Sequence, residues 1–170
     1  MLTFRKAVQD DLPGMMALVK QAQAYIASQG IDQWQDGYPS EDILAEDICL
    51  GRIYVYDDDG AIASITVMTD EPEPVYNNIE GEWLSSEPYL TIHRMALDDS
   101  HRHSGLAAKI IEHAVEMAKS MNLSAVRADT HRGNKAMRRF LEKSGFAERG
   151  IVTYEPTAGD PLRVAYEMML

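Results

Sequence analysis

The sequence contains a single cysteine, Cys49, and few basic residues for its length. One thiol cannot form an internal disulfide or supply a cysteine-rich zinc site, and it suits a reducing compartment. Lysine and arginine together number 16, against 27 aspartate and glutamate residues, which gives a net charge of −11. Nucleic-acid binding needs a net basic footprint, so this balance argues against a nucleic-acid partner and favours cationic partners such as amines.

Long hydrophobic runs are also missing. The apolar stretches are short and interrupted by charge, so no membrane-spanning helix and no membrane partner are predicted. The N-terminal residues Met1 to Lys6 lack the apolar core of a secretion signal, and we expect a cytoplasmic protein. The chain has 170 residues, 45% of them hydrophobic and 25% charged, an ordinary globular balance. We therefore expect one domain over residues 1–170.

Hydrophobic periodicity predicts a chain in which the later strands alternate with helices. The expected helices run from the Asp10 and Asp11 caps to near Gly30, from the Ser40 cap to Gly51, over 104–121 and over 134–143. The expected strands cover 2–7, 53–56, 61–68, 89–97, 124–129, 146–154 and 163–168, and a turn over 156–161 joins the last two. Residues 30–39 and 69–88 read as loops. This order predicts an α/β domain.

The strongest local pattern lies at residues 97–108, where a buried strand leads through a basic, glycine-containing turn into a long helix. The first helical turn has backbone N–H groups without an intrahelical partner, and the helix dipole adds positive charge there. Gly105 allows a ligand close to the backbone. These features predict a cradle for a pyrophosphate, although an ordinary capped helix start explains the same residues. The glycine pattern matches neither a Walker A loop nor a dinucleotide fingerprint.

Residues 102–107 (RHSGLA) resemble the Arg/Gln-x-x-Gly-x-Gly/Ala signature of the GNAT family of N-acetyltransferases. Three further segments resemble the same family: 90–97 its fourth strand, 126–134 its fifth strand and the following asparagine, and 140–146 its next helix and exit turn. The resemblance covers nearly the whole chain. It implies a mixed, mostly antiparallel sheet in which these two strands splay apart, flanked by about four helices.

The resemblance also implies an activity: transfer of an acetyl group from acetyl-CoA to a primary amine, which attacks the thioester directly, with no metal. The implied coenzyme contacts are the main chain at a strand bulge, the amides at the helix start and one asparagine, namely Met95, Ala96, Leu97, Arg102, His103, Ser104, Gly105, Leu106, Ala107 and Asn134. Simpler explanations are open at this point, because Met95 and Leu97 suit a core and Asn134 suits a helix N-cap.

An incoming alkylamine is mostly protonated at neutral pH, so a base must accept its proton. Glu82 and His93 are the two candidates, and His131 is a third that more simply shapes the turn before Asn134. Glu82 could equally be a surface acid and His93 a core residue. The sequence departs from many relatives at Leu141, where they carry a tyrosine that protonates the departing thiolate. Tyr154 or water could take that role, or no acid is needed.

The acceptor side is the least specific part of the sequence. Trp34 and Tyr38 could pack over an amine by cation–π attraction, or could staple the first two helices together. Residues 70–87 hold six acids and no lysine or arginine, which favours a cationic acceptor such as a polyamine, an aminoglycoside or a peptide amine, or makes a solvated acidic face. The alternatives to an enzyme of this kind are a non-catalytic acyl-CoA-binding or sensing module and a different nucleotide-phosphate enzyme. A homodimer is an expectation from similar proteins.

Overall fold

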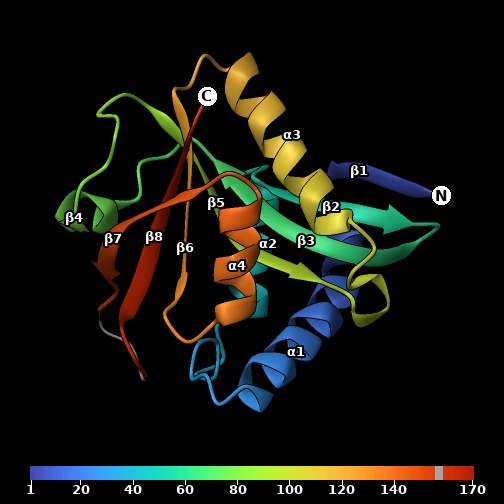
Figure 1. Ribbon diagram of the computed structural model, residues 1–170. Coiled ribbons are helices and arrows are strands. Elements are labelled where there is room, and N and C mark those ends of the chain that lie inside the picture. The colour runs from blue at the N-terminus through green and yellow to red at the C-terminus, as the bar shows by residue number, and fades with distance from the viewer. Residues whose placement is uncertain (156–158) are drawn as a thin grey trace.

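A computed structural model describes residues 1–155 and 159–170, so the turn expected over 156–161 lies partly outside the described residues. Its strands form one eight-stranded sheet with the order β1-β2-β3-β5-β6-β8-β7-β4 (Figure 1). The strands are β1 (Leu2–Lys6), β2 (Ile53–Asp58), β3 (Ala61–Thr69), β4 (Glu80–Gly81), β5 (Tyr89–Leu97), β6 (Ala125–His131), β7 (Ala147–Thr153) and β8 (Leu162–Met169). Within the described residues β5 and β6 are the one parallel pair, and the other neighbours are antiparallel. The expected mixed α/β sheet is confirmed.

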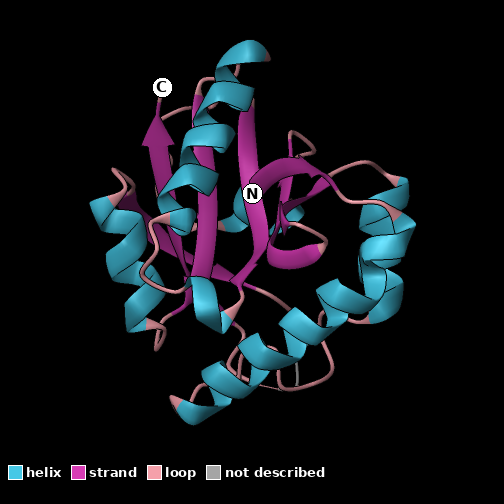
Figure 2. Cartoon of the chain, turned by 90° about the vertical axis from the view of Figure 1, so that its right-hand side faces the viewer, coloured by secondary structure: helices cyan, strands magenta, loops and turns pink. Residues whose placement is uncertain are grey.

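Helices cover both faces of the sheet (Figure 2). Helices α1 (Leu12–Ser28) and α2 (Glu41–Cys49) bury one apolar cluster against β2 and β3. Helices α3 (Leu106–Ser120) and α4 (Lys135–Lys143) bury a second cluster on the opposite face, which extends over β5, β6 and β8. The two faces are separate because side chains alternate along each strand.

Of the residues expected to cap helices, Ser40 and Asn134 do so and Asp11 does not. Ser40 accepts a hydrogen bond from the Ile43 amide at the start of α2, as its position predicts. Asp11 precedes α1 but does not cap it with its side chain. Its carboxylate instead accepts the Val8 amide and pairs with Arg5, at 2.7 Å. Arg5 on β1 thus forms an ion pair with the Asp11 carboxylate, which the sequence pattern predicts as the cap of α1.

Residues 69–88, which the sequence predicts as a loop, contain a short 3-10 helix (Pro74–Asn78) and the edge strand β4. β4 pairs with β7 at Gly81 and Gly150, and Tyr76 is buried against Val152 and Ala165. Since Val152 and Ala165 lie on β7 and β8, this segment forms a third cover, over the far half of the sheet. It carries Glu73 and Tyr76 to the point where β5 and β6 separate.

Among the helices of the described ranges, none is both long and apolar enough to cross a bilayer.

Candidate functional site

A cavity of about 870 Å³ opens where β5 and β6 separate. The ladder between these two strands runs from Tyr89–Ala125 to Ile92–Ala128 and then stops, although β5 continues to Leu97 and β6 to His131. The backbone edges of the two strands are therefore free of each other beyond Ile92, which leaves donors and acceptors for a bound chain. We call the place where the ladder ends the fork.

The bulge that the family resemblance implied is present in β5. Two residue steps on β3, from Ile65 to Val67, face three on β5, from Ala96 to His93. Arg94 adopts the left-handed region there, with φ of 50°. The extra residue changes the direction of the strand. As a result, the main chain of Met95 lies next to the cavity and has no partner on β3. Ala96 and Leu97 line the same cavity and pair with β3 on their other edge.

The start of α3 lies at the cavity, through Arg102, His103 and Ala107. Gly105 precedes the helix with φ of 84°, and a Cβ there would meet no heavy atom within 4 Å. The backbone is thus open on the side where a ligand would approach the first-turn amides. The Ser104 hydroxyl accepts the Leu106 amide at 3.3 Å, so one of these amides already has a partner.

Two predicted coenzyme contacts are also engaged within the protein. The Arg102 guanidinium lies 3.7 Å from the centre of the Tyr25 ring and 2.6 Å from Asp99. The Asn134 side-chain oxygen accepts the Met137 amide at 3.1 Å, so Asn134 caps α4. Both residues line the cavity. Arg102 would reach a phosphate by exchanging Asp99, whereas Asn134 has its amide NH₂ available while the cap stays in place.

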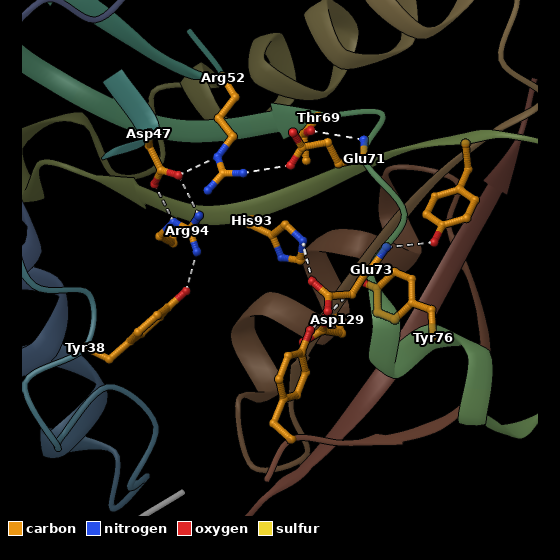
Figure 3. A network of polar contacts seen from close by, with 12 residues as sticks. Tyr38, Asp47, Arg52, Thr69, Glu71, Glu73, Tyr76, His93, Arg94 and Asp129 are labelled. Carbon is orange, nitrogen blue, oxygen red and sulfur yellow. Dashed lines mark hydrogen bonds and ion pairs between the residues drawn. The ribbon is translucent and has the colours of Figure 1, made fainter. Parts of the chain in front are cut away.

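His93 lies just past the last pair of the ladder, and its Nε2 is 3.3 Å from the Glu73 carboxylate (Figure 3). The hydrogen bond from His93 lowers the pKa of Glu73, against the opposing effect of burial. Glu73 is therefore ionised at neutral pH and holds the Nε2–H of the imidazole. The other ring nitrogen, Nδ1, is the one that can accept a proton.

Asp129 is the counterpart of His93 on β6, one residue past Ala128. Its carboxylate accepts the hydroxyl groups of Tyr76 and Tyr154, at 2.7 and 2.8 Å. Burial, and then the charge of Asp129, raise the pKa of both tyrosines, so both remain protonated donors at neutral pH. Tyr154 and Asp129 line the cavity.

A buried ion-pair network holds the β5 bulge against α2 (Figure 3). Asp47, which has no solvent exposure, accepts two hydrogen bonds from Arg94, at 2.8 and 2.9 Å, and one from Arg52 at 2.7 Å. Arg94 also donates to the Tyr38 hydroxyl, and Arg52 pairs with Glu71. No local pattern in the sequence predicts this network.

Trp34 and Tyr38 meet edge to face, with ring centres 6.2 Å apart, and both line the cavity. Trp34 also packs against the cluster under α1 and α2, so it serves the helix contact and the cavity wall together. Leu141 is buried and reaches the cavity from α4, which leaves an apolar side chain where many relatives have a tyrosine.

Glu82 does not belong with these residues. Its side chain is exposed and its amide donates to the Arg149 carbonyl next to β4, and it is not among the described residues that line the cavity. Glu82 therefore lies apart from the residues gathered at the fork, whereas His93 lies among them. His131 shapes the turn before Asn134: its Nδ1 accepts the Gly133 amide at 2.9 Å, and its Nε2 lies 3.1 Å from Asp32.

Sequence reasoning missed Glu73, Asp129 and Asp47. Glu73 and Asp129 were visible as single acids, one in an acidic segment and one at the end of an apolar strand, but nothing in the sequence linked them to the fork. No group of three or more histidine, cysteine or acidic residues that could hold a metal occurs in the described part of the chain.

The sequence matches the Acetyltransferase (GNAT) family over residues 17–146, and the chain belongs to this family. A GNAT acetyltransferase from Streptococcus agalactiae is 33% identical, covers 99% of this chain and 95% of its own, and superposes with a TM-score of 0.87. The ribosomal-protein-S18-alanine N-acetyltransferase from Escherichia coli is 19% identical, covers 99% and 94%, and has a TM-score of 0.69. A GNAT structure from Listeria monocytogenes is likewise 19% identical, covers 99% and 95%, and has a TM-score of 0.74. No curated protein sequence matches.

Proposed function

We propose that this member of the family transfers the acetyl group of acetyl-CoA to a primary amine. The observation that carries the proposal is the cavity at the fork, which joins the start of α3 to His93. An anion would sit on the helix amides at one end of this cavity. The reacting groups would meet at the other end, beside a histidine that can accept a proton.

The coenzyme would be held mainly by main-chain groups. Its pyrophosphate would accept hydrogen bonds from the amides of residues 102–107, and its pantetheine arm would pair with β5 at Met95, Ala96 and Leu97 as an added strand. The Met95 amide, which has no partner on β3, would polarise the thioester carbonyl. Asn134 would reach the arm from the start of α4. Because these contacts use main-chain atoms, they depend little on the side chains, and apolar residues such as Met95 and Leu97 could make them.

In the reaction, His93 would take the proton of the acceptor ammonium on Nδ1 while Glu73 holds Nε2–H. The neutral nitrogen then attacks the thioester carbon, so that the N–C bond forms and the C–S bond breaks. The C–S electron pair goes to sulfur, and the thiolate takes the proton from the imidazolium. The nitrogen, which is cationic after the attack, loses one further proton to water, so one proton is released overall. The Tyr154 hydroxyl already donates a hydrogen bond to Asp129, and the Leu141 side chain has no proton to donate. We therefore assign neither residue as the general acid.

The acceptor class is part of the proposal. The Escherichia coli relative acts, by its name, on an alanine of a ribosomal protein, but at 19% identity that likeness supports the fold alone. The acids around the fork favour an acceptor that is cationic. A cytoplasmic location, and a homodimer, stay predictions from the sequence.

The test is incubation of the purified protein with acetyl-CoA and a panel of primary amines, followed by mass spectrometry of the products and measurement of free thiol. We expect acetylated amine and thiol in equal amounts, together with a rise in melting temperature on adding acetyl-CoA. Stabilisation by acetyl-CoA without any product would favour the non-catalytic binding module. Stabilisation by ATP or NAD in place of acetyl-CoA would favour a different nucleotide enzyme.

A further inference from the structure

Three acidic side chains lie around the fork, and two of them have a cationic partner. Glu73 has His93, and Asp47 lies between Arg94 and Arg52. Asp129 has two tyrosine hydroxyls on Oδ2, and no arginine, lysine or histidine of the described residues forms an ion pair with it. A partly buried carboxylate without a cation is unfavourable, and binding of a cation relieves that cost.

The two tyrosines hold the carboxylate without neutralising it. Tyr76 is buried in the cluster beneath the 69–88 segment, and Tyr154 follows β7, so the two donors approach from different parts of the chain. Both hydroxyls bond to Oδ2, and no donor to Oδ1 is recorded within residues 1–155 and 159–170. Oδ1 is thus available to a ligand at a fixed position.

The strand geometry indicates which ligand Asp129 would meet. Ile92 and Ala128, the last pair of the ladder, belong to the apolar cluster under α3 and α4. Side chains alternate along a strand, so the next residues, His93 and Asp129, point to the opposite face. Figure 3 shows His93, Glu73 and Asp129 gathered there, with Tyr38 across the cavity. The coenzyme enters from the α3 side in the function proposed above, so Asp129 faces the acceptor.

We propose that Asp129, held by Tyr76 and Tyr154, binds the ammonium group of the acceptor, and that the acceptors are therefore amines that arrive as cations. The inference rests on the proposed acetyl transfer and names its substrate class. Asp129 would orient the ammonium beside His93, which then removes one proton and releases the neutral nitrogen for attack. Amines that are neutral at pH 7, such as aromatic amines, gain nothing from Asp129.

The first experiment compares cyclohexylamine, a cation at pH 7, with aniline, a neutral amine on a ring of the same size. Asp129→Asn keeps the shape of the side chain and an oxygen for the tyrosines but removes the charge. We expect kcat/KM for cyclohexylamine to fall by about thirtyfold or more, because a partner of a buried charge pair is lost. The value for aniline should change little. Glu87→Gln, an exposed acid, makes the same change in net charge and should leave both values as they are.

A second measurement does not require turnover. Calorimetry in the presence of coenzyme A compares N-cyclohexylguanidinium, a permanent cation, with N-cyclohexylurea, its neutral analogue. We expect the wild type to bind the guanidinium at least tenfold more tightly and Asp129→Asn to lose this preference. Equal affinity of the wild type for the two compounds overturns the proposal even if the variant does not fold.

The two experiments separate this inference from the proposed function. Acetylation of amines with no dependence on Asp129 overturns the cation site and leaves acetyl transfer standing. Guanidinium binding that depends on Asp129, with no acetylated product from any amine, overturns acetyl transfer and supports the cation site.

Discussion

His93 owes its role to Glu73, because a neutral histidine without a partner can carry its proton on either ring nitrogen and has no fixed direction. The carboxylate, 3.3 Å from Nε2, selects the tautomer in which Nδ1 is free and holds the ring toward the cavity. Glu73 is a positioning residue in this arrangement. It can hold the ring because it stays ionised, and its pKa is lowered mainly by the hydrogen bond from His93.

Replacing His93 with glutamine should lower kcat about 100-fold or more, the usual loss when a general base is removed. Acetyl-CoA should still raise the melting temperature of the variant, since the helix amides and the β5 edge are untouched. Glu82→Gln is the matched control and should keep full activity, because Glu82 is exposed and away from the cavity. The opposite result, with Glu82→Gln inactive and His93→Gln active, would restore Glu82 as the base.

Gly105→Glu should abolish the stabilisation by acetyl-CoA. The substitution places a carboxylate where the pyrophosphate would lie, and it forces a side chain into a left-handed backbone at a cost of about 1–2 kcal/mol. Gly105→Ala separates the two effects, because its Cβ meets no atom within 4 Å and carries no charge. We expect the alanine variant to be slightly less stable and still to bind acetyl-CoA in a thermal-shift titration. Equal binding by both variants would contradict the cradle.

At the scale of elements, the site depends on β5, which pairs with β3 from Thr91 to Leu97 on both sides of the bulge but with β6 over only four residues. The bulge at Arg94 turns the strand away, and the ion pair between Arg94 and Asp47 holds that turn against α2. Left-handed backbone at a non-glycine residue is unfavourable by itself. The buried pair offsets this cost, so α2 sets the conformation of a strand on which it has no backbone hydrogen bond.

Asp47→Asn should therefore lower the free energy of unfolding by about 3 kcal/mol or more, because it leaves two arginines without their shared buried carboxylate. Urea unfolding followed by circular dichroism measures the loss. Glu46→Gln, the exposed neighbour on the same helix, should change the value by less than about 0.5 kcal/mol. Equal stability of the two variants would show that the network does not hold the bulge.

At the scale of the whole molecule, acidic residues determine how stability responds to pH. Hydrogen bonds lower the pKa of several carboxylates, from Arg5 for Asp11, from His93 for Glu73 and from Ser100 for Asp98. A carboxylate with a lowered folded-state pKa contributes stability above its unfolded pKa, and this contribution disappears as pH falls through the folded value. The ordinary values are 3.8 for Asp11 and 4.5 for Glu73, so the loss belongs to acid solution.

We expect the free energy of unfolding to be nearly constant from about pH 6 to 7 and to fall steadily below about pH 4. Arg5→Gln should lower stability at neutral pH and make the acid loss shallower, because Asp11 and Asp57 lose the guanidinium that favours their charged forms. Urea unfolding at a series of pH values tests this, with Lys20→Gln as an exposed control. An unchanged acid slope in Arg5→Gln would contradict the assignment.

The sequence by itself determined the order of the elements and the start of α3, because both depend on neighbours within a few residues. Helical spacing of apolar residues predicted four helices, and the glycine turn predicted where α3 begins. The structure differs from the sequence prediction where a residue far along the chain forms a contact with a group that the local pattern assigned to another role. Asp11 turned from the helix to Arg5, and residues 69–88 gained an edge strand because β7 offered an unpaired edge.

Only the tertiary structure decided which side chains meet at the fork. Asp129 finds Tyr76 53 positions away, and Asp47 finds Arg94 47 positions away. Such pairs depend on strand register and on the bulge, since a slip of one residue moves every side chain to the other face of the sheet. Local patterns do not specify that register. Asp129, which in the sequence is one acid among many, thus lies at the fork with two tyrosine donors and no ion-pair partner among the described residues.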